Sequence, residues 1–201
     1  PPPSPPPSSN RRQRQMCIRD SLVDLSPDSR LIVTGQIGCG KTTLAKQIST
    51  RVGLTHLHID RFNSDEDPFH SAARAASAIE GGWVAEANVW QIPQPIWESA
   101  DLALFLDYAN TVHYRRILLR CVQSCIAKPT WANISGSVVN EWSHFTIMYR
   151  YADENRADWQ KQGGITSAAI PVIRFSSPRE TEKLFAESVS GSTPIKPRAK
   201  L

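Results

Sequence analysis

Glycines, a lysine and a threonine occur between residues 35 and 42 in an order that suits the binding of a phosphate group. The segment reads GQIGCGKT and matches the pattern G-x-x-x-x-G-K-[ST] at every fixed position. Glycines reach backbone angles that other residues resist, so amide N–H groups can close around phosphate oxygens. Lys41 supplies a positive charge to the β- and γ-phosphates, and the Thr42 hydroxyl is placed to hold Mg²⁺. The segment predicts a loop that binds ATP and Mg²⁺ through Gly35, Gln36, Ile37, Gly38, Cys39, Gly40, Lys41, Thr42 and Thr43.

Three acidic residues close predicted strands and are candidates for further chemistry. Asp60 ends the predicted strand 57–60, and Glu86 ends the predicted strand 83–86. An acid at the carboxyl end of a parallel strand points into the crevice where ligands bind. We therefore expect Asp60 to accept a proton from a substrate hydroxyl or to hold a magnesium-bound water, and Glu86 to bind magnesium. The alternatives are a helix cap or a loop aspartate for Asp60, and a structural role for Asp107 at the end of the next strand.

Arginines form the second group of candidates. Arg116 and Arg120 lie four residues apart, so both project from one face of a predicted helix. Arg150 and Arg156 lie in a later predicted helix that could close over the site. Guanidinium groups suit phosphates and stabilise charge in a transition state, so all four are candidate catalytic residues. The alternative is that they are solvated helix arginines.

The cysteines and histidines suggest no metal centre by their spacing in the sequence. Cys121 and Cys125 lie four apart on a predicted helix without a second ligand pair, and we interpret them as packing residues. We also expect no metal-ligand constellation among the five histidines, which are His56, His58, His70, His113 and His144.

Short apolar runs alternate with helical patterns and provide the elements that position these residues. The predicted strands span 31–34, 57–60, 83–86, 101–107 and 171–175. The predicted helices span 44–53, 70–79, 111–126, 138–162 and 178–189. Alternation of this kind predicts an α/β fold with a parallel sheet buried on both faces. The expected architecture is a three-layer P-loop NTPase fold with a five-stranded parallel sheet and a helical lid.

Charge is distributed unevenly along the 201 residues, whose net charge is +4. Residues 1–21 contribute +3, residues 190–201 contribute +3, and residues 22–189 therefore carry −2. A mildly acidic body does not suit nucleic acid, so we expect no direct nucleic-acid binding. Residues 1–21 are rich in proline, serine and arginine, and we expect them to be disordered. They contain no apolar stretch of the kind found in secretory signals. The alternative is that they are an artefact, because they resemble a translated sequencing adapter. We expect residues 22–189 to form one cytoplasmic domain, followed by a basic flexible tail at 190–201.

The pattern as a whole resembles the small P-loop kinases related to adenylate kinase, in particular the branch named DNA topology modulation or flagellar-regulation proteins. The segments 31–49, 54–60, 83–89 and 101–107 carry the resemblance, followed by the arginine pair on the next helix. The resemblance implies a lid over 127–140 and an acceptor bound over residues 60–90. The chain departs from the family pattern at Glu86, Ala87 and Val89, where the family has aspartate, glycine and tyrosine.

These features favour a kinase that transfers the γ-phosphate of ATP to a small molecule or a nucleotide. The alternative is a nucleotide-dependent ATPase or switch that acts indirectly on DNA topology or transcription, as the name of the family branch suggests. The two differ in what they require, because a kinase needs an acceptor pocket and a lid that excludes water. No motif identifies the acceptor, the choice between ATP and GTP, or the oligomeric state. No run of about 20 apolar residues is present, and we expect no membrane association.

Overall fold

The structure is a computed structural model that describes residues 25–127, 136, 138–139, 142–143, 146 and 170–183. The predicted leader at 1–21 and tail at 190–201 lie outside the described residues. So do Arg150, Arg156 and most of the predicted lid and of the predicted helix 138–162.

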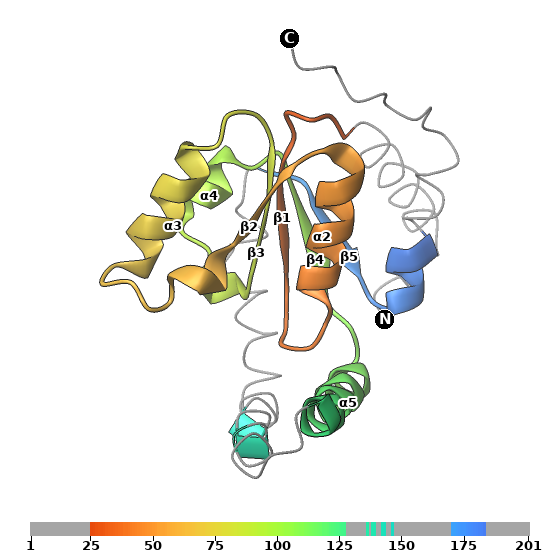
Figure 1. Cartoon of the computed structure of the whole chain (residues 1–201). Helices are drawn as coiled ribbons and strands as arrows, with labels where there is room; N and C mark the ends of the chain where they lie inside the picture. The colour runs from red at the N-terminus through yellow and green to blue at the C-terminus, as the bar shows by residue number, and fades with distance from the viewer. Residues whose placement is uncertain are drawn as a thin grey trace, which may run out of the picture.

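Five parallel strands form one sheet, as the sequence predicts (Figure 1). The order across the sheet is β2-β3-β1-β4-β5. The strands are β1 (Arg30–Gly35), β2 (Thr55–His58), β3 (Trp83–Ala87), β4 (Leu102–Leu106) and β5 (Val172–Phe175). The chain leaves β1 toward one edge of the sheet and leaves β4 toward the other. A crevice is expected at such a switch point, outside the carboxyl ends of the strands.

Within the described residues, the helices confirm most of the predicted pattern and add three short elements that it missed. They are α2 (Lys41–Val52), η1 (Ile59–Phe62), α3 (Pro68–Ser77), η2 (Val89–Gln91), α4 (Gln94–Ser99) and α5 (Asn110–Ala127), and residues 178–183 are also helical. Gly53 ends α2 with a φ of 82°, which glycine adopts without strain. α3 begins two residues earlier than predicted, because Pro68 starts the helix and the Asp67 side chain caps it.

The prediction that Asp60 closes the second strand is wrong. β2 ends at His58, and Asp60 lies on the 3₁₀ turn η1 that follows. Among the strands that the structure describes, β2 lies at the edge of the sheet beside β3, and their register ends with the pair His58 and Glu86. β3 continues for one more residue, Ala87, whereas the chain turns into η1 at Ile59.

Helices cover both faces of the sheet and give the three layers that the sequence predicts. On one face, Leu44, Ala45 and Ile48 of α2 pack on alternate residues of the central strands. On the other face, Ala72 and Ala76 of α3 and Ile96 of α4 pack on the intervening residues. Burial of these two apolar layers is the main favourable contribution to the stability of the fold. Strands buried on both faces read as continuous apolar runs, which explains why β1 and β4 were recognisable in the sequence.

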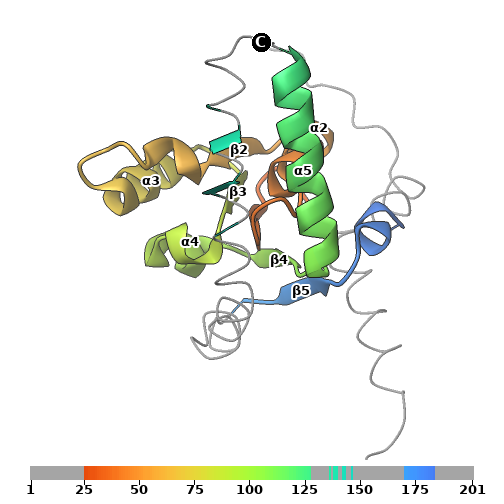
Figure 2. The same ribbon diagram turned by 90° about the horizontal axis from the view of Figure 1, so that it is seen from below.

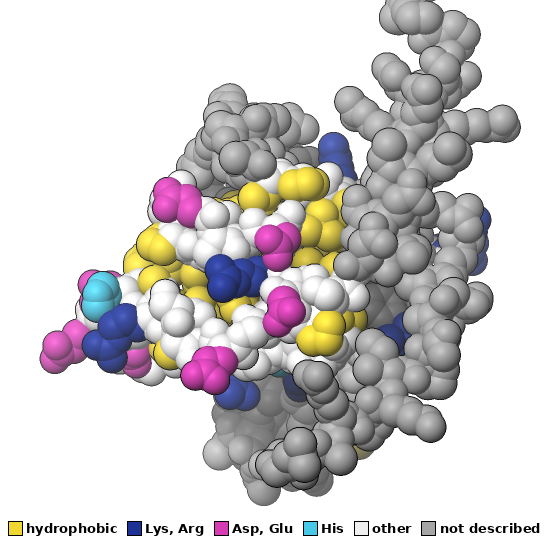
Figure 3. Space-filling view, turned by 90° about the horizontal axis from the view of Figure 1, so that it is seen from above, with side chains coloured by type: hydrophobic (Ala, Val, Ile, Leu, Met, Phe, Trp, Pro, Cys, Tyr) yellow, Lys and Arg dark blue, Asp and Glu magenta, His cyan; other side chains and the backbone are white. Residues whose placement is uncertain are grey.

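Two surfaces lie at opposite ends of the strands. Figure 2 shows α5 crossing the carboxyl edge of the sheet in front of α2, beside the loop that follows β1. The face seen from above, at the amino ends, mixes acidic and basic side chains among apolar ones (Figure 3). Within the described ranges, no helix combines the length and apolar character needed to cross a bilayer.

Candidate functional site

The predicted phosphate loop connects β1 to α2, as the sequence requires. A Cβ on Gly35 would lie 2.6 Å from the carbonyl oxygen of Leu106, so only glycine fits where the loop leaves the sheet. Gly40 precedes the first turn of α2 with a φ of 98°, which places the backbone N–H groups of the helix start toward the loop. The N-terminus of an α-helix carries a partial positive charge, which favours an anion at this position.

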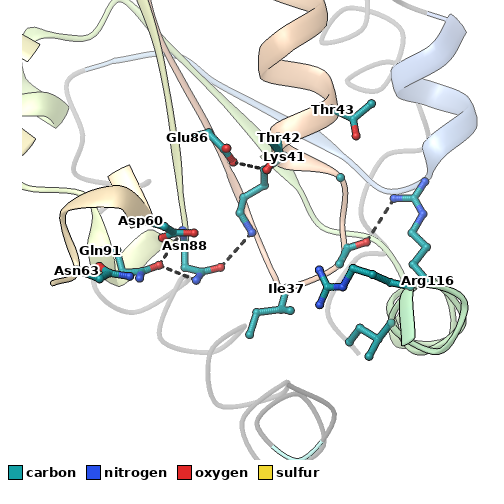
Figure 4. A pocket seen from close by; sticks show the side chains of 14 residues that line it. Ile37, Lys41, Thr42, Thr43, Asp60, Asn63, Glu86, Asn88, Gln91 and Arg116 are labelled. Carbon is teal, nitrogen blue, oxygen red and sulfur yellow. Dashed lines mark hydrogen bonds between the residues drawn. The ribbon is translucent and has the colours of Figure 1, made fainter. Parts of the chain in front are cut away.

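Lys41 lies inside the loop and is buried. Its ammonium group donates to the carbonyl oxygens of Gly35 and Gln36, at 3.2 Å and 3.0 Å. It also donates to Oδ1 of Asn88 at 3.0 Å, a contact from the end of β3 that the sequence analysis did not foresee. The Asn88 amide donates in turn to Oε1 of Gln91 at 2.6 Å, within the capping box of η2. Asn88 therefore orients the lysine while η2 orients Asn88, as Figure 4 shows.

Thr42 and Glu86 meet across the gap between α2 and β3. The Thr42 hydroxyl donates to Oε2 of Glu86 at 3.0 Å, and the Glu86 carboxylate is almost fully buried. A hydroxyl and a carboxylate are oxygen ligands, the type that Mg²⁺ requires, and both line the same pocket as the phosphate loop. The donor set present therefore fits magnesium.

A pocket of about 500 Å³ brings most of the predicted site residues together. Lys41, Thr42, Asp60, Glu86, Arg116 and Arg120 all line it. Of the other predicted loop residues, Ile37, Gly38, Gly40 and Thr43 also line it. Asn63, Asn88, Gln91 and Ile117 complete its walls, and none of these had been assigned a role from the sequence.

Asp60 reaches the pocket although it does not close a strand. Its Oδ1 atom is buried and has no hydrogen-bond partner among the residues that the structure describes. A buried polar atom without a partner costs free energy, so such an atom in a polar pocket indicates a place for a ligand donor. In Figure 4, Asp60 lies beside Asn63, Asn88 and Gln91, on the side of the pocket away from Arg116.

Arg116 and Arg120 lie on the pocket side of α5, as their spacing predicts. Arg116 donates to the carbonyl oxygen of Cys39 at 2.5 Å, and its guanidinium lies 5.6 Å from the ring centre of Tyr108. Arg116 therefore fixes the back of the phosphate loop to α5. Arg120, one turn further along α5, is exposed and also lines the pocket.

A second cavity of about 340 Å³ lies on the other side of the loop. Its lining includes Cys39, Gly40, Thr43 and Arg116, together with Tyr108, Pro178, Thr181 and Glu182. Burial raises the pKa of the Cys39 thiol, so this predicted loop residue is an uncharged packing group. Gly40, Thr43 and Arg116 line both this cavity and the larger pocket, so the two adjoin each other at the start of α2.

The structure brings two of the histidines into a group of possible metal ligands that their spacing in the sequence did not indicate. His56, His58 and Glu86 place one ligand atom each within 4.8 Å of one another. His56 and His58 alternate on one strand, and the register brings Glu86 of the neighbouring strand opposite His58. The available signal was the spacing H-x-H of His56 and His58, of which only His58 lies in the predicted strand 57–60. Which strand lies beside β2 is not readable from the sequence.

Asp107 has the structural role that the sequence left open. It is buried at the end of β4 and forms an ion pair with Arg174 of the neighbouring strand β5. It does not line the pocket.

Comparison with known proteins gives similarity in fold. No model of a known protein family matches the chain, and neither does any curated protein. A shikimate kinase from Acinetobacter baumannii, solved with shikimate, is 11% identical with a TM-score of 0.45, covering 86% of this chain and 97% of that one. A deoxyadenosine kinase from M. mycoides, solved with dATP, is 10% identical with a TM-score of 0.44, covering 81% and 100%. At these values the assignment of the site rests on its own geometry.

Proposed function

We propose that this protein is a kinase that transfers the γ-phosphate of ATP to a small-molecule or nucleotide acceptor. The observation that carries the proposal is the common pocket of Lys41, Thr42, Glu86 and Asp60. The loop amides and Lys41 are groups that bind a triphosphate. Asp60 is a carboxylate that can accept a hydrogen bond from an acceptor hydroxyl and so orient it. The resemblance to the DNA topology modulation branch remains part of this proposal.

The two cavities suggest where the parts of ATP bind. Phosphates fit the larger pocket, where the backbone of the loop and the start of α2 provide donors. The adenosine part fits the second cavity, which adjoins the same loop. Tyr108, Leu106 and Pro178 give the wall of this cavity an aromatic and aliphatic character that suits a base. Arg116 borders both cavities and therefore lies close to the junction of base and phosphates.

The acceptor is expected on the Asp60 side, where Asn63, Asn88 and Gln91 give the wall a polar character. Asp60 takes the proton of the acceptor hydroxyl while the new oxygen–phosphorus bond forms. The bond between the γ-phosphorus and the bridging oxygen breaks at the same time, and ADP leaves with that oxygen. Lys41 and Arg120 stabilise negative charge on the transferring group.

Thr42 and Glu86 are the residues that would hold Mg²⁺. Held by these two residues, Mg²⁺ would supply positive charge against the phosphates of the nucleotide. The contact between Thr42 and Glu86 keeps both oxygen ligands at one place before the nucleotide arrives.

The test is acceptor-dependent formation of ADP. The full chain is incubated with ATP, Mg²⁺ and a panel of nucleoside monophosphates and small alcohols, and ADP and phosphorylated acceptor are both measured. Lys41→Ala is expected to abolish turnover. Lys46→Ala is the matched control, because Lys46 lies exposed on the same helix outside the pocket.

Two outcomes would contradict the kinase. ATP hydrolysis that is independent of every acceptor would favour the nucleotide-dependent switch instead. Full turnover by Lys41→Ala would show that the phosphate loop does not bind the reacting nucleotide.

A further inference from the structure

We propose that His56, His58 and Glu86 form a binding site for a divalent transition-metal ion such as Zn²⁺, separate in its chemistry from the magnesium site. The site goes beyond the proposed kinase activity and does not depend on it. Its donor atoms are Nε2 of His56, Nδ1 of His58 and Oε1 of Glu86, which lie within 4.8 Å of one another.

The strand arrangement explains why these three side chains converge. Residues two apart on a strand point to the same side of a sheet, so His56 and His58 share a face. His58 and Glu86 are paired in register on β2 and β3, so Glu86 points to that face as well. β2 is an edge strand, and both histidines are partly exposed, with side-chain exposures of 17% and 28%. His56 Nε2 itself is buried and has no hydrogen-bond partner among the described residues, so it is a donor atom available to an ion that enters past the partly exposed rings.

The Glu86 carboxylate needs a cation. It is only 1% exposed, and its partners are the Thr42 hydroxyl and the two imidazoles. Among the described residues, Glu86 forms no ion pair with a lysine or arginine within 4.0 Å. A buried carboxylate is costly without a compensating charge, and an ion beside Oε1 would supply one.

The donor types select the metal. Two imidazole nitrogens and one carboxylate oxygen suit zinc and its neighbours in the first transition row, whereas Mg²⁺ prefers oxygen ligands. Tetrahedral zinc with bonds of about 2.0–2.1 Å places its ligand atoms about 3.3 Å apart. His56 Nε2 lies 3.6 Å from Glu86 Oε1, close to that spacing. His58 Nδ1 is hydrogen-bonded to the same oxygen, so this ring must rotate away from Oε1 when an ion enters between them. Three protein ligands leave a fourth position for water.

Glu86 belongs to both sites through different oxygens. Oε1 faces the histidines, and Oε2 accepts from Thr42. Occupancy by zinc is therefore expected to change the affinity for magnesium-nucleotide, and the reverse effect must be equal.

The test is metal binding by the full chain after treatment with a chelator. Zn²⁺ is titrated by calorimetry and Co²⁺ by its visible absorption, in the wild type and in His56→Gln, His58→Gln and the double variant. Glutamine keeps much of the volume and a hydrogen-bond donor. His70→Gln is the matched control, since His70 is exposed on α3 outside the cluster. Loss of a residue that only hydrogen-bonds a metal ligand lowers metal affinity by up to about 100-fold. Because His56 and His58 would bind the ion directly, each single substitution is expected to lower Zn²⁺ affinity by at least about 100-fold. His70→Gln is expected to leave it unchanged.

A second measurement uses the wild type alone. Zn²⁺ is expected to protect His56 and His58, but not His70, from modification by diethyl pyrocarbonate, as read by peptide mass spectrometry. Unchanged Zn²⁺ affinity in a folded double variant, or equal modification of all three histidines with and without Zn²⁺, would overturn the proposal. Failure of the kinase proposal would be distinct, because zinc binding would persist without acceptor-dependent turnover.

Discussion

The Thr42 hydroxyl donates a hydrogen bond of 3.0 Å to Oε2 of Glu86 and so connects the first turn of α2 to the end of β3. Thr42 is the last residue of the phosphate-loop pattern, whereas Glu86 lies 44 residues further along the chain. β3 lies next to β1 in the sheet, and this neighbourhood places the carboxylate at the loop. A magnesium-dependent reaction at this site would therefore require both residues of the pair, because they are the proposed ligands of the ion.

Thr42→Ala tests this pair without removing the buried carboxylate. Loss of the hydroxyl is expected to lower kcat/KM by about 10²-fold, because one ligand for the ion that stabilises transition-state charge is missing. Thr42→Ser retains the hydroxyl and is expected to keep most of the activity. Steady-state kinetics over a range of Mg²⁺ concentrations provide the measurement. Equal activity in Thr42→Ala and the wild type would exclude a role for this hydroxyl.

Asn88→Ala tests whether Asn88 positions Lys41. Asn88 contacts Lys41 and also caps η2 through Gln91. Loss of a cap costs about 1 kcal/mol of stability, so Asn88→Ala is expected to lower both Tm and turnover. Gln91→Ala is the control, because it removes the Gln91 half of the capping box but no atom that contacts Lys41. A fall in kcat with unchanged KM in Asn88→Ala, larger than in Gln91→Ala, indicates positioning of Lys41, and equal effects would argue against it.

Gly40→Ala tests the entry to α2. A left-handed backbone costs a non-glycine residue roughly 1–2 kcal/mol, and the added Cβ would lie 3.1 Å from the Arg116 guanidinium. Gly53→Ala carries the same backbone penalty at φ 82°, with no atom within 4 Å of the new Cβ. Both variants are expected to lose stability in chemical unfolding, whereas only Gly40→Ala is expected to lose nucleotide affinity. Normal nucleotide affinity in Gly40→Ala would show that the loop tolerates the change.

The stability of the protein is expected to fall below pH 6.5 in part because of His113. This residue is fully buried beneath the phosphate loop, and Nε2 donates to the Tyr108 carbonyl oxygen at 3.1 Å. Burial lowers the pKa of His113, which backbone hydrogen bonding only partly offsets. Below its ordinary value of about 6.5 the unfolded chain therefore binds a proton that the folded chain excludes, and the free energy of unfolding decreases as pH falls.

The measurement is urea unfolding of the wild type and His113→Gln between pH 7.5 and 5.5. The variant is expected to show a weaker decrease across this interval, because it lacks the group that takes up the proton. Parallel pH profiles for the two proteins would assign the decrease to other groups.

Sequence alone determined the elements whose signals are local. The phosphate loop lies within eight consecutive residues, and the apolar runs of β1 and β4 are continuous because both faces of the sheet are covered. The helical spacing of Arg116 and Arg120 also placed both residues correctly on one side of α5. The short helix α4 was missed because its six residues are too few to show a helical period.

Tertiary structure alone decided which distant residues meet. The order β2-β3-β1-β4-β5 brings Glu86 to Thr42, Asn88 to Lys41, and the histidines of β2 to Glu86. Because β2 ends at His58, Asp60 lies on the turn η1 rather than at the end of the strand, and from this turn it still lines the pocket. Such contacts depend on strand neighbours and register, which are set by packing over the whole sheet rather than by any short segment.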